Sequence, residues 1–287
     1  MKLSKGVREE MVRRYVKKRK DFWSVTQGIY TVHSMVSASK ALEYAIFMQD
    51  FAARADKVFE VRPKGTFRPV IYHFKDPKTM MQTIKEHTAT IELDGDIPEW
   101  AGGVYLANFQ RLYVYEHEST REIMLHEGTH QFLNYLFGSG YRRLPIWVDE
   151  GLATNLETWD LNESRAVSIE MNRQRSERRF VVRNIFGMKK PPITLGQLFE
   201  KDREGWLSAQ GEAAMCQYGV AWSFVDYCLN TADGKAFLKQ VCTRAYGGKK
   251  STKIPKKLVE LYEKKWRQYV KEKVLPGIPE NGNVEVR

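Results

Sequence analysis

Two histidines one helical turn apart enclose a glutamate near the middle of the chain. Residues 126–130 read His-Glu-Gly-Thr-His, within a segment whose pattern predicts a helix. Side chains at positions i and i+4 lie above one another on one helix face, so His126 and His130 can reach the same ion. Glu127 then lies beside the open position of the ion, where a carboxylate can take a proton from bound water. The spacing indicates a catalytic metal site.

A catalytic zinc ion needs a third protein ligand and keeps a fourth position for water. The nearest downstream positions do not supply one, because Asn134 and Leu136 stand where a further ligand would be needed. Glu150 follows His130 with nineteen residues between them, in a segment that Pro145 opens as a second helix. A helix, a reversal and an antiparallel helix would return Glu150 to the histidine pair. We therefore expect one Zn²⁺ per chain, held by the two histidines and Glu150.

The first of these helices has recognisable ends in the sequence. Ser119 is a typical N-cap residue, and Glu122 three positions later completes the pattern of a capping box. Gly138 follows the last apolar residue, as glycine does after many helices. The pattern predicts a helix over residues 120–137.

Strand patterns come first in the chain and helical patterns later. We expect strands at 28–34 and 68–74, a strand pair at 102–107 and 111–115, and helices at 38–61 and 77–84, the latter capped by Asp76. From Ser119 to about residue 275 the pattern is almost wholly helical. This order predicts an α+β fold with a small β-rich lobe, a mostly helical lobe and the metal-binding helix between them.

The expected domain organisation follows from the same pattern. Residues 1–24 form a basic helical leader, residues 25–275 one catalytic domain, and residues 276–287 a tail. Within the domain, residues 25–118 form the α/β lobe and residues 119–275 the helical lobe.

The two motifs together resemble a known family. His126 to His130, followed by the Pro-Ile-Trp-Val-Asp-Glu-Gly-Leu-Ala stretch at 145–153, is similar to the gluzincins, zinc peptidases of the peptidase-MA-like superfamily whose third ligand is a glutamate on the following helix. More narrowly, the chain resembles a bacterial peptidase-MA-like group described as a domain of unknown function. The resemblance covers roughly residues 25–275. It implies a zincin-like fold, peptide-bond hydrolysis, His126, His130 and Glu150 as zinc ligands, and Glu127 as the general base.

The resemblance also implies further residues of the site. Gluzincins of the aminopeptidase type use a downstream tyrosine to donate to the oxyanion, and Tyr218, 88 residues after His130, stands at a comparable separation. Tyr105 and Tyr227 are the rival candidates for this role. Asp149 and Asn134 are candidates for orienting the ligand imidazoles.

The predicted strand before the metal-binding helix is a candidate for substrate binding. An extended peptide commonly adds to an exposed sheet edge, and Gly102, Gly103 and Tyr105 lie in this strand. The two glycines would permit close backbone approach. The chain lacks the Gly-x-Met-Glu-Asn segment with which aminopeptidases of this type hold a free amino terminus. We therefore expect an endopeptidase acting on peptides or proteins.

Charge and composition leave two other classes of protein open. The 46 Lys and Arg residues against 35 Asp and Glu give a net charge of +11, concentrated at residues 2–20 and 249–273. Apolar positions within both runs favour solvated helix faces over a nucleic-acid-binding arm. The alternatives are a zinc-binding scaffold without turnover and a basic nucleic-acid-associated protein. We expect no transmembrane segment, and the sequence begins without an apolar leader, which fits a cytoplasmic protein or a secreted one whose leader was removed.

Overall fold

The computed structural model describes residues 4–59, 62–89, 101–159, 178–188, 191–249 and 254–278. The chain forms two compact units. The sheet unit takes in residues 1–139 and 159–166, and the helical unit residues 140–158 and 167–287. The structure is a mixed α/β protein, which agrees with the expected α+β class at this level.

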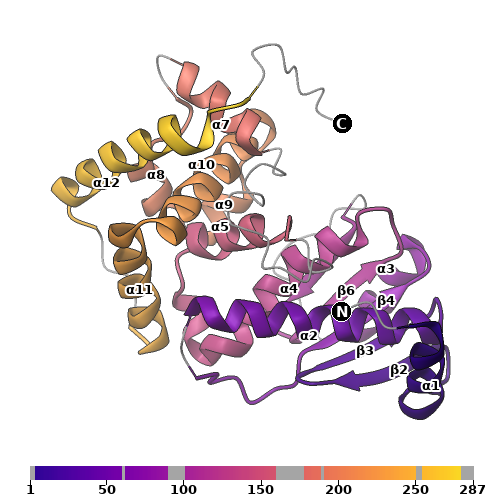
Figure 1. Cartoon of the computed structure of the whole chain (residues 1–287). Coiled ribbons are helices and arrows are strands. Elements are labelled where there is room, and N and C mark those ends of the chain that lie inside the picture. The colour runs from indigo at the N-terminus through magenta and orange to yellow at the C-terminus, as the bar shows by residue number, and fades with distance from the viewer. Residues whose placement is uncertain are drawn as a thin grey trace. The chain divides into compact units, whose positions relative to one another are not determined.

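A six-stranded sheet forms the frame of the sheet unit (Figure 1). Its strands are β1 (Lys17–Arg19), β2 (Phe22–Gln27), β3 (Tyr30–Ser34), β4 (Val70–Phe74), β5 (Gly103–Leu106) and β6 (Arg111–Tyr115), in the spatial order β1-β2-β3-β4-β6-β5. The pairs β3–β4 and β4–β6 are parallel, and the other three pairs are antiparallel. Strand β5 thus forms one edge of the sheet and β1 the other.

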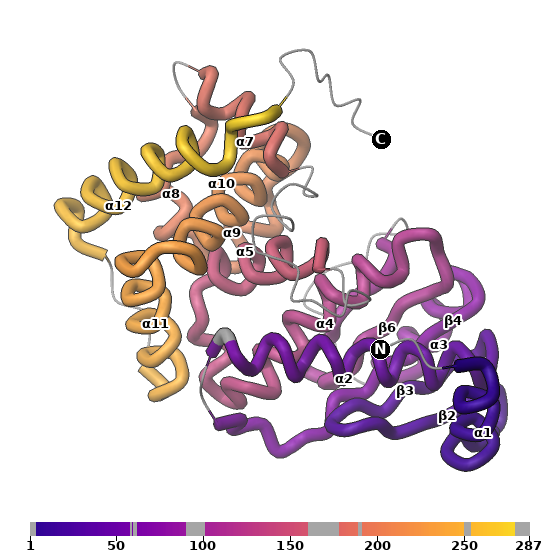
Figure 2. The backbone as a smooth tube through the Cα atoms, in the orientation of Figure 1, coloured from indigo at the N-terminus to yellow at the C-terminus, as the bar shows by residue number. Residues whose placement is uncertain are grey.

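Helices cover both faces of this sheet, as the course of the backbone in Figure 2 shows. They are α2 (Ala38–Phe59), α3 (Pro77–Thr88) and α4 (Thr120–Phe137). Helix α1 (Lys5–Tyr15) packs on α2. Helix α2 packs on β2 and β3, and α4 packs on β5 and β6. Helix α3 covers the opposite face, where Met80 and Ile84 bury Phe74 and Tyr113. The sequence-based lobes placed the segment of α4 with the later helices, whereas its packing on the sheet puts it in the sheet unit.

The helical unit is built around one long buried helix. Its elements are η1 (Gly138–Arg143, which begins at the end of the sheet unit), α5 (Ile146–Leu156), α7 (Arg178–Gly187), α8 (Leu195–Glu200), α9 (Arg203–Leu207), α10 (Gly211–Asn230), α11 (Ala232–Tyr246), α12 (Lys256–Tyr269) and η2 (Val270–Val274). Helix α10 contacts α5, α7, α8, α11 and α12. Helix α10 approaches α5 closely, and Gly151 of α5 permits this: a Cβ atom added there would lie 2.6 Å from Val225 Cγ2 and 2.9 Å from the Ala221 carbonyl oxygen.

Several predicted elements and two of the caps are confirmed. Helix α4 spans Thr120–Phe137 as predicted and ends at Gly138, whose N–H donates to the Asn134 carbonyl. Helix α2 begins at Ala38 and ends at Phe59, and the last two residues predicted for it, 60 and 61, lie outside the described residues. Asp76 accepts a hydrogen bond from the Thr79 backbone N–H at 2.8 Å and caps α3, which continues to Thr88. The expected antiparallel strand pair is β5 and β6.

Two local predictions are wrong. The leader is helical only over α1, because residues 17–19 and 22–24 belong to β1 and β2, whose register pairs Lys17 with Ser24. The capping box at the start of α4 does not form, since the Ser119 side chain makes no capping hydrogen bond. The Thr120 hydroxyl bonds the preceding turn instead, donating to the His117 carbonyl and accepting from the His117 N–H, both at 2.6 Å.

Candidate metal centre

Helix α4 carries the two histidines, and small residues let it pack closely. Gly128 stands between His126 and His130, where an added Cβ atom would lie 2.4 Å from Met48 Cε on α2. A larger residue at this position would have to displace that side chain. Helix α4 is thus enclosed by α2 and the sheet. Of its two histidines, His130 is buried and His126 is half-buried.

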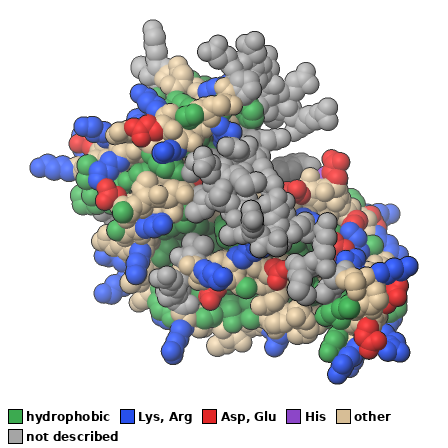
Figure 3. Space-filling model, viewed as in Figure 1, with side chains coloured by type: hydrophobic (Ala, Val, Ile, Leu, Met, Phe, Trp, Pro, Cys, Tyr) green, Lys and Arg blue, Asp and Glu red, His purple; other side chains and the backbone are tan. Residues whose placement is uncertain are grey.

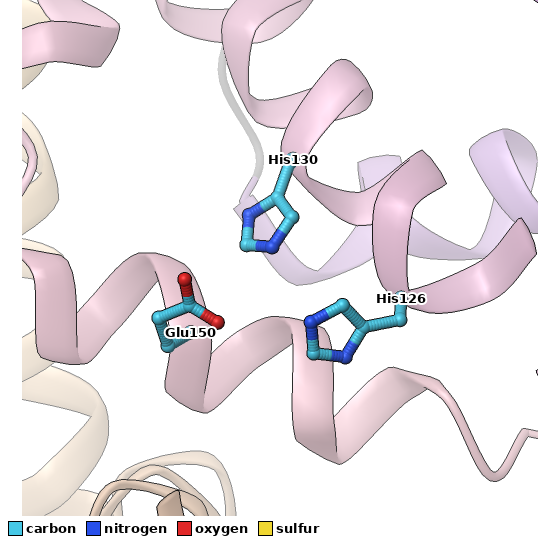
Figure 4. A group of neighbouring side chains, drawn as sticks. All are labelled: His126, His130 and Glu150. Atoms are coloured by element: carbon cyan, nitrogen blue, oxygen red, sulfur yellow. The ribbon is translucent and has the colours of Figure 1, made fainter. Parts of the chain in front are cut away.

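The predicted ligands come together. His126 and His130 on α4 and Glu150 on α5 each offer one ligand atom, and these atoms lie within 4.8 Å of one another. Figure 4 shows both imidazoles and the carboxylate pointing toward a common point. Two imidazole nitrogens and one carboxylate oxygen are the donor set that catalytic zinc prefers. The donor chemistry and the spacing of these three side chains therefore fit a zinc ion.

Glu127 follows His126 on α4, and its side chain is held by the sheet. Its Oε2 atom accepts a hydrogen bond of 2.8 Å from the backbone N–H of Tyr105 on β5. Because the bond occupies one carboxylate oxygen, the orientation of Glu127 is fixed by the backbone of the edge strand. The sequence predicted Glu127 and the strand separately, and their hydrogen bond is a tertiary contact.

The pairing of β5 and β6 shows which backbone groups of β5 face outward. The Tyr115 N–H donates to the Gly102 carbonyl at 3.4 Å, and the register places Gly103 opposite Val114. Because hydrogen-bonded and non-hydrogen-bonded pairs alternate in an antiparallel ladder, the N–H and C=O groups of Gly103 and Tyr105 point away from β6. The Tyr105 N–H donates to Glu127, so the groups of Gly103 are the ones that another extended chain could pair with.

Gly102, just before β5, and Gly103, its first residue, are both explained by packing on α4. An added Cβ atom on Gly102 would lie 2.3 Å from Ile123 Cδ1, and one on Gly103 would lie 2.7 Å from Ile123 Cγ2. The close approach that the structure shows at these glycines is to α4, and their role in substrate binding stays a prediction. Gly102 also turns its carbonyl toward β6, which leaves Gly103 and Tyr105 as the outward-facing candidates.

Asn134 bonds to one of the rival tyrosines. Its Nδ2 atom donates to the Tyr105 hydroxyl at 2.7 Å, and both side chains are buried. The bond ties α4 to β5 one helical turn beyond His130. Orientation of an imidazole by Asn134 stays a prediction, as does a catalytic role for Tyr105.

Asp149, next to Glu150 in the sequence, lies in a buried polar group that the sequence did not predict. Its Oδ2 atom accepts from the Tyr141 hydroxyl and from Arg203 Nη2, both at 2.9 Å. Burial alone lowers the pKa of Arg203, but the charge of Asp149 outweighs it and raises that pKa. Arg203 therefore stays charged and holds a buried carboxylate one residue before Glu150. No spacing rule links Arg203 to residue 149, so the sequence gave no signal for the pair.

The two tyrosines of α10 have different surroundings. Tyr227 is buried between Phe224 and Tyr269, with ring centres 5.7 and 5.6 Å away, which makes it part of the core of the helical unit. Tyr218 is half-buried, and its ring meets that of Trp206 edge-on at 5.1 Å. Of the two, only Tyr218 keeps an accessible part, and its catalytic role stays a prediction.

Residues 122–255 match the model of a family described as a protein of unknown function, DUF1570. The match covers somewhat less than half of the chain, and it takes in α4, α5 and α10 with both histidines, Glu150 and Tyr218. No curated protein matches this chain. In the part of the chain that the structure describes, no helix is both long enough and apolar enough to span a membrane.

Proposed function

We propose that this protein is a zinc-dependent peptidase that cleaves peptide bonds within peptides or proteins. The observation that supports the proposal most strongly is the convergence of His126, His130 and Glu150, with ligand atoms within 4.8 Å of one another. The presence of Glu127 directly after the ligand His126 supports a catalytic over a purely structural ion, since a structural site has no use for a neighbouring base. Membership of the gluzincins and a zincin-like fold belong to the same proposal.

The proposed chemistry divides between the ion and the chain. Zinc held by His126, His130 and Glu150 would supply a Lewis acid and would lower the pKa of bound water to about 7. The Glu127 carboxylate takes a proton from the attacking water and delivers it to the leaving amine. The backbone N–H of Tyr105 holds the Glu127 side chain at the edge of the sheet, so this carboxylate needs little reorganisation before it accepts the proton.

The position of β5 as an edge strand among the described residues supports an extended substrate. Gly103 and Tyr105 point their backbone groups outward, and the Glu127 carboxylate already bonds the N–H of Tyr105. A peptide that added to this edge as a further strand would therefore pass beside the general base. Such pairing recognises backbone and not chain ends, which agrees with the cleavage of internal peptide bonds.

The experiment combines metal analysis with a peptide-library digest. Wild-type protein purified without chelators should contain about one zinc per chain and cleave library peptides internally. Glu150→Ala should lose most of the zinc, because it removes one of three ligands. Glu127→Gln should keep the zinc while hydrolysis falls by about 10²–10⁴-fold, the usual contribution of a general acid–base group. Glu122→Gln, an exposed glutamate on the same helix, is the matched control and should leave both unchanged.

Each arm can contradict one part of the proposal. Full zinc content in Glu150→Ala would overturn the ligand assignment. Equal hydrolysis by wild type and Glu127→Gln would remove Glu127 as the base. Stoichiometric zinc with no cleavage of any library peptide would favour the zinc-binding scaffold over the peptidase.

A further inference from the structure

Asp149 carries a charge within a helix that is buried along its whole length. Its side chain is 1% exposed, and every residue of α5 from Ile146 to Leu156 is buried. Taking a carboxylate out of water is costly, and a buried ion pair is often no more stabilising than apolar residues of the same volume. Stability alone therefore does not account for a charge at position 149, directly before the ligand Glu150.

Two other elements hold the Asp149 carboxylate in the first turn of α5. The Tyr141 hydroxyl on η1 and Arg203 Nη2 on α9 both donate to its Oδ2 atom at 2.9 Å. The N-cap residue Pro145 makes no side-chain hydrogen bond to the helix, so these two bonds fix the first turn where a cap would otherwise act. Burial lowers the pKa of Arg203, whereas the charges of Asp149 and Glu150 are among those that raise it. The guanidinium therefore lies close enough to the ligand carboxylate to interact with its charge.

The residues on both sides of Glu150 are fixed by tertiary contacts. Asp149 before it is bound from η1 and α9, and Gly151 after it lies so close to α10 that an added Cβ atom would be 2.6 Å from a side-chain carbon there. Helices α9 and α10 are also tied to each other, because Gln217 Nε2 donates to the Trp206 carbonyl at 2.9 Å. The helix that carries Glu150 is thus held by two helices that hold one another.

We propose that Arg203 is a positioning residue of the metal site, which binds Asp149 and so holds the first turn of α5 where Glu150 is presented to the ion. The proposal rests on the zinc site proposed above and adds a residue that belongs to neither of its sequence motifs. A ligand coordinates tightly only where its surroundings hold it in the coordinating direction. Groups that orient metal ligands from behind contribute about 10–100-fold to metal affinity.

The test measures the zinc dissociation constant of the metal-free full chain by competition with a chromophoric chelator. Arg203→Gln removes the charge that holds Asp149 and should weaken zinc binding about 10–100-fold. Arg203→Lys keeps a charged donor for the single hydrogen bond to this carboxylate and should bind zinc within about threefold of the wild type. Arg143→Gln, at an exposed arginine of η1, is the matched control and should leave the zinc affinity unchanged.

A double variant separates positioning from folding, because Arg203→Gln alone leaves a buried charge without its cation. Asp149→Asn combined with Arg203→Gln removes both charges, so its unfolding temperature should return toward that of the wild type. Its zinc binding should stay about tenfold weaker or more, since the charged tie to α5 is still missing. Zinc affinity within about threefold of the wild type in this double variant, or equal weakening by Arg143→Gln, would overturn the positioning role.

The same assay tests the underlying metal site separately. Glu150→Ala should lose most of the zinc binding whatever Arg203 does, because it removes a ligand. Undiminished zinc affinity in Glu150→Ala would contradict the ligand set and with it the proposed function. Loss of affinity in Glu150→Ala, together with wild-type affinity in the variants of Arg203, would contradict the positioning role alone.

Discussion

Tyr218 is the residue whose role depends most on an experiment. It lies on α10 three and seven residues before Ala221 and Val225, which approach Gly151 on α5. Because residues at these intervals share one helix face, the Tyr218 side chain lies on the face of α10 that packs toward α5, the helix of Glu150. Its contacts with Trp206 and the Arg178 guanidinium, 5.6 Å from the ring centre, hold the ring in place.

Tyr218→Phe separates a catalytic hydroxyl from a structural ring. If the hydroxyl donates to the oxyanion, kcat should fall by about 10²–10³, the usual cost of one such donor. KM and zinc content should change little, because the donated bond matters only in the transition state. The measurement is steady-state kinetics on a peptide found in the library digest. A kcat within a few-fold of wild type together with a lower unfolding temperature would assign Tyr218 to packing, and Tyr105→Phe would be the next variant.

At the scale of elements, a polar cluster fixes the start of α4. Glu116 follows β6 and precedes the helix, and its carboxylate lies 2.7 Å from Lys40 Nζ and 3.2 Å from the Tyr44 hydroxyl, both on α2. His73 Nε2 at the end of β4 lies 2.7 Å from the same carboxylate but off the direction of a good N–H hydrogen bond. Glu43 of α2 pairs with Arg121 in the first turn of α4. Helix α2 therefore anchors the helix that carries the histidine pair.

This cluster predicts acid sensitivity of the fold. Burial lowers the pKa of His73 to about 4. The charge of Lys40 lowers it as well, and the charges of Glu116 and Glu43, which raise it, do not compensate. The unfolded chain, with an ordinary histidine pKa of 6.5, binds this proton more readily, so stability is lost as the pH falls from 6.5 toward 4. One group shifted this far contributes up to about 3 kcal/mol. Burial would raise the pKa of Glu116, but Lys40 and His73 lower it, so its contribution is lost on further acidification.

The measurement is urea unfolding of wild type and His73→Gln between pH 7 and pH 4. The free energy of unfolding of the wild type should fall with acid over this range, and that of His73→Gln should fall less steeply, because the variant has no imidazole to protonate. His117→Gln, at an exposed histidine, is the control and should keep the slope of the wild type. Parallel slopes for wild type and His73→Gln would show that protonation of His73 does not limit stability.

At the scale of the whole molecule, charge and metal have different consequences. Lys and Arg side chains are spread over the visible face with Asp and Glu among them (Figure 3), so the net charge of +11 does not itself mark a binding site. A metal ion acts on the folding equilibrium of the protein, since a ligand that binds only the folded state stabilises it.

Zinc should therefore raise the unfolding temperature. When the free zinc concentration is a thousand times the dissociation constant, binding stabilises the folded state by about 4 kcal/mol, which raises the unfolding temperature by several degrees. Calorimetry of chelator-treated protein with and without added zinc measures the shift. Magnesium at the same concentration should have little effect, because it prefers an all-oxygen shell over imidazole. Glu150→Ala should abolish the zinc shift, and an undiminished shift in that variant would mean that zinc binds elsewhere.

The sequence by itself determined the features that depend on local spacing. Histidines at i and i+4 share a helix face in any helix, and Asp76 before Pro77 caps a helix because its carboxylate reaches the N–H of Thr79. Apolar periodicity placed α2 correctly for the same reason. The capping box failed because it depends on a competition: Ser119 and Thr120 could each bond the turn, and only the folded backbone selects Thr120.

Only the tertiary structure decided how distant segments meet. Strand β1 consists of Lys and Arg residues alone, and no alternation marks it as a strand. It becomes a strand by pairing with β2, which in turn pairs with β3. Other contacts also join residues that are far apart in the chain. They are the bond from Tyr105 to Glu127, the pairing of Arg203 with Asp149, and the strand register that sets Tyr72 beside His33 and Tyr113. Such contacts depend on strand order, register and helix packing, and spacing along the sequence carries no information about any of these.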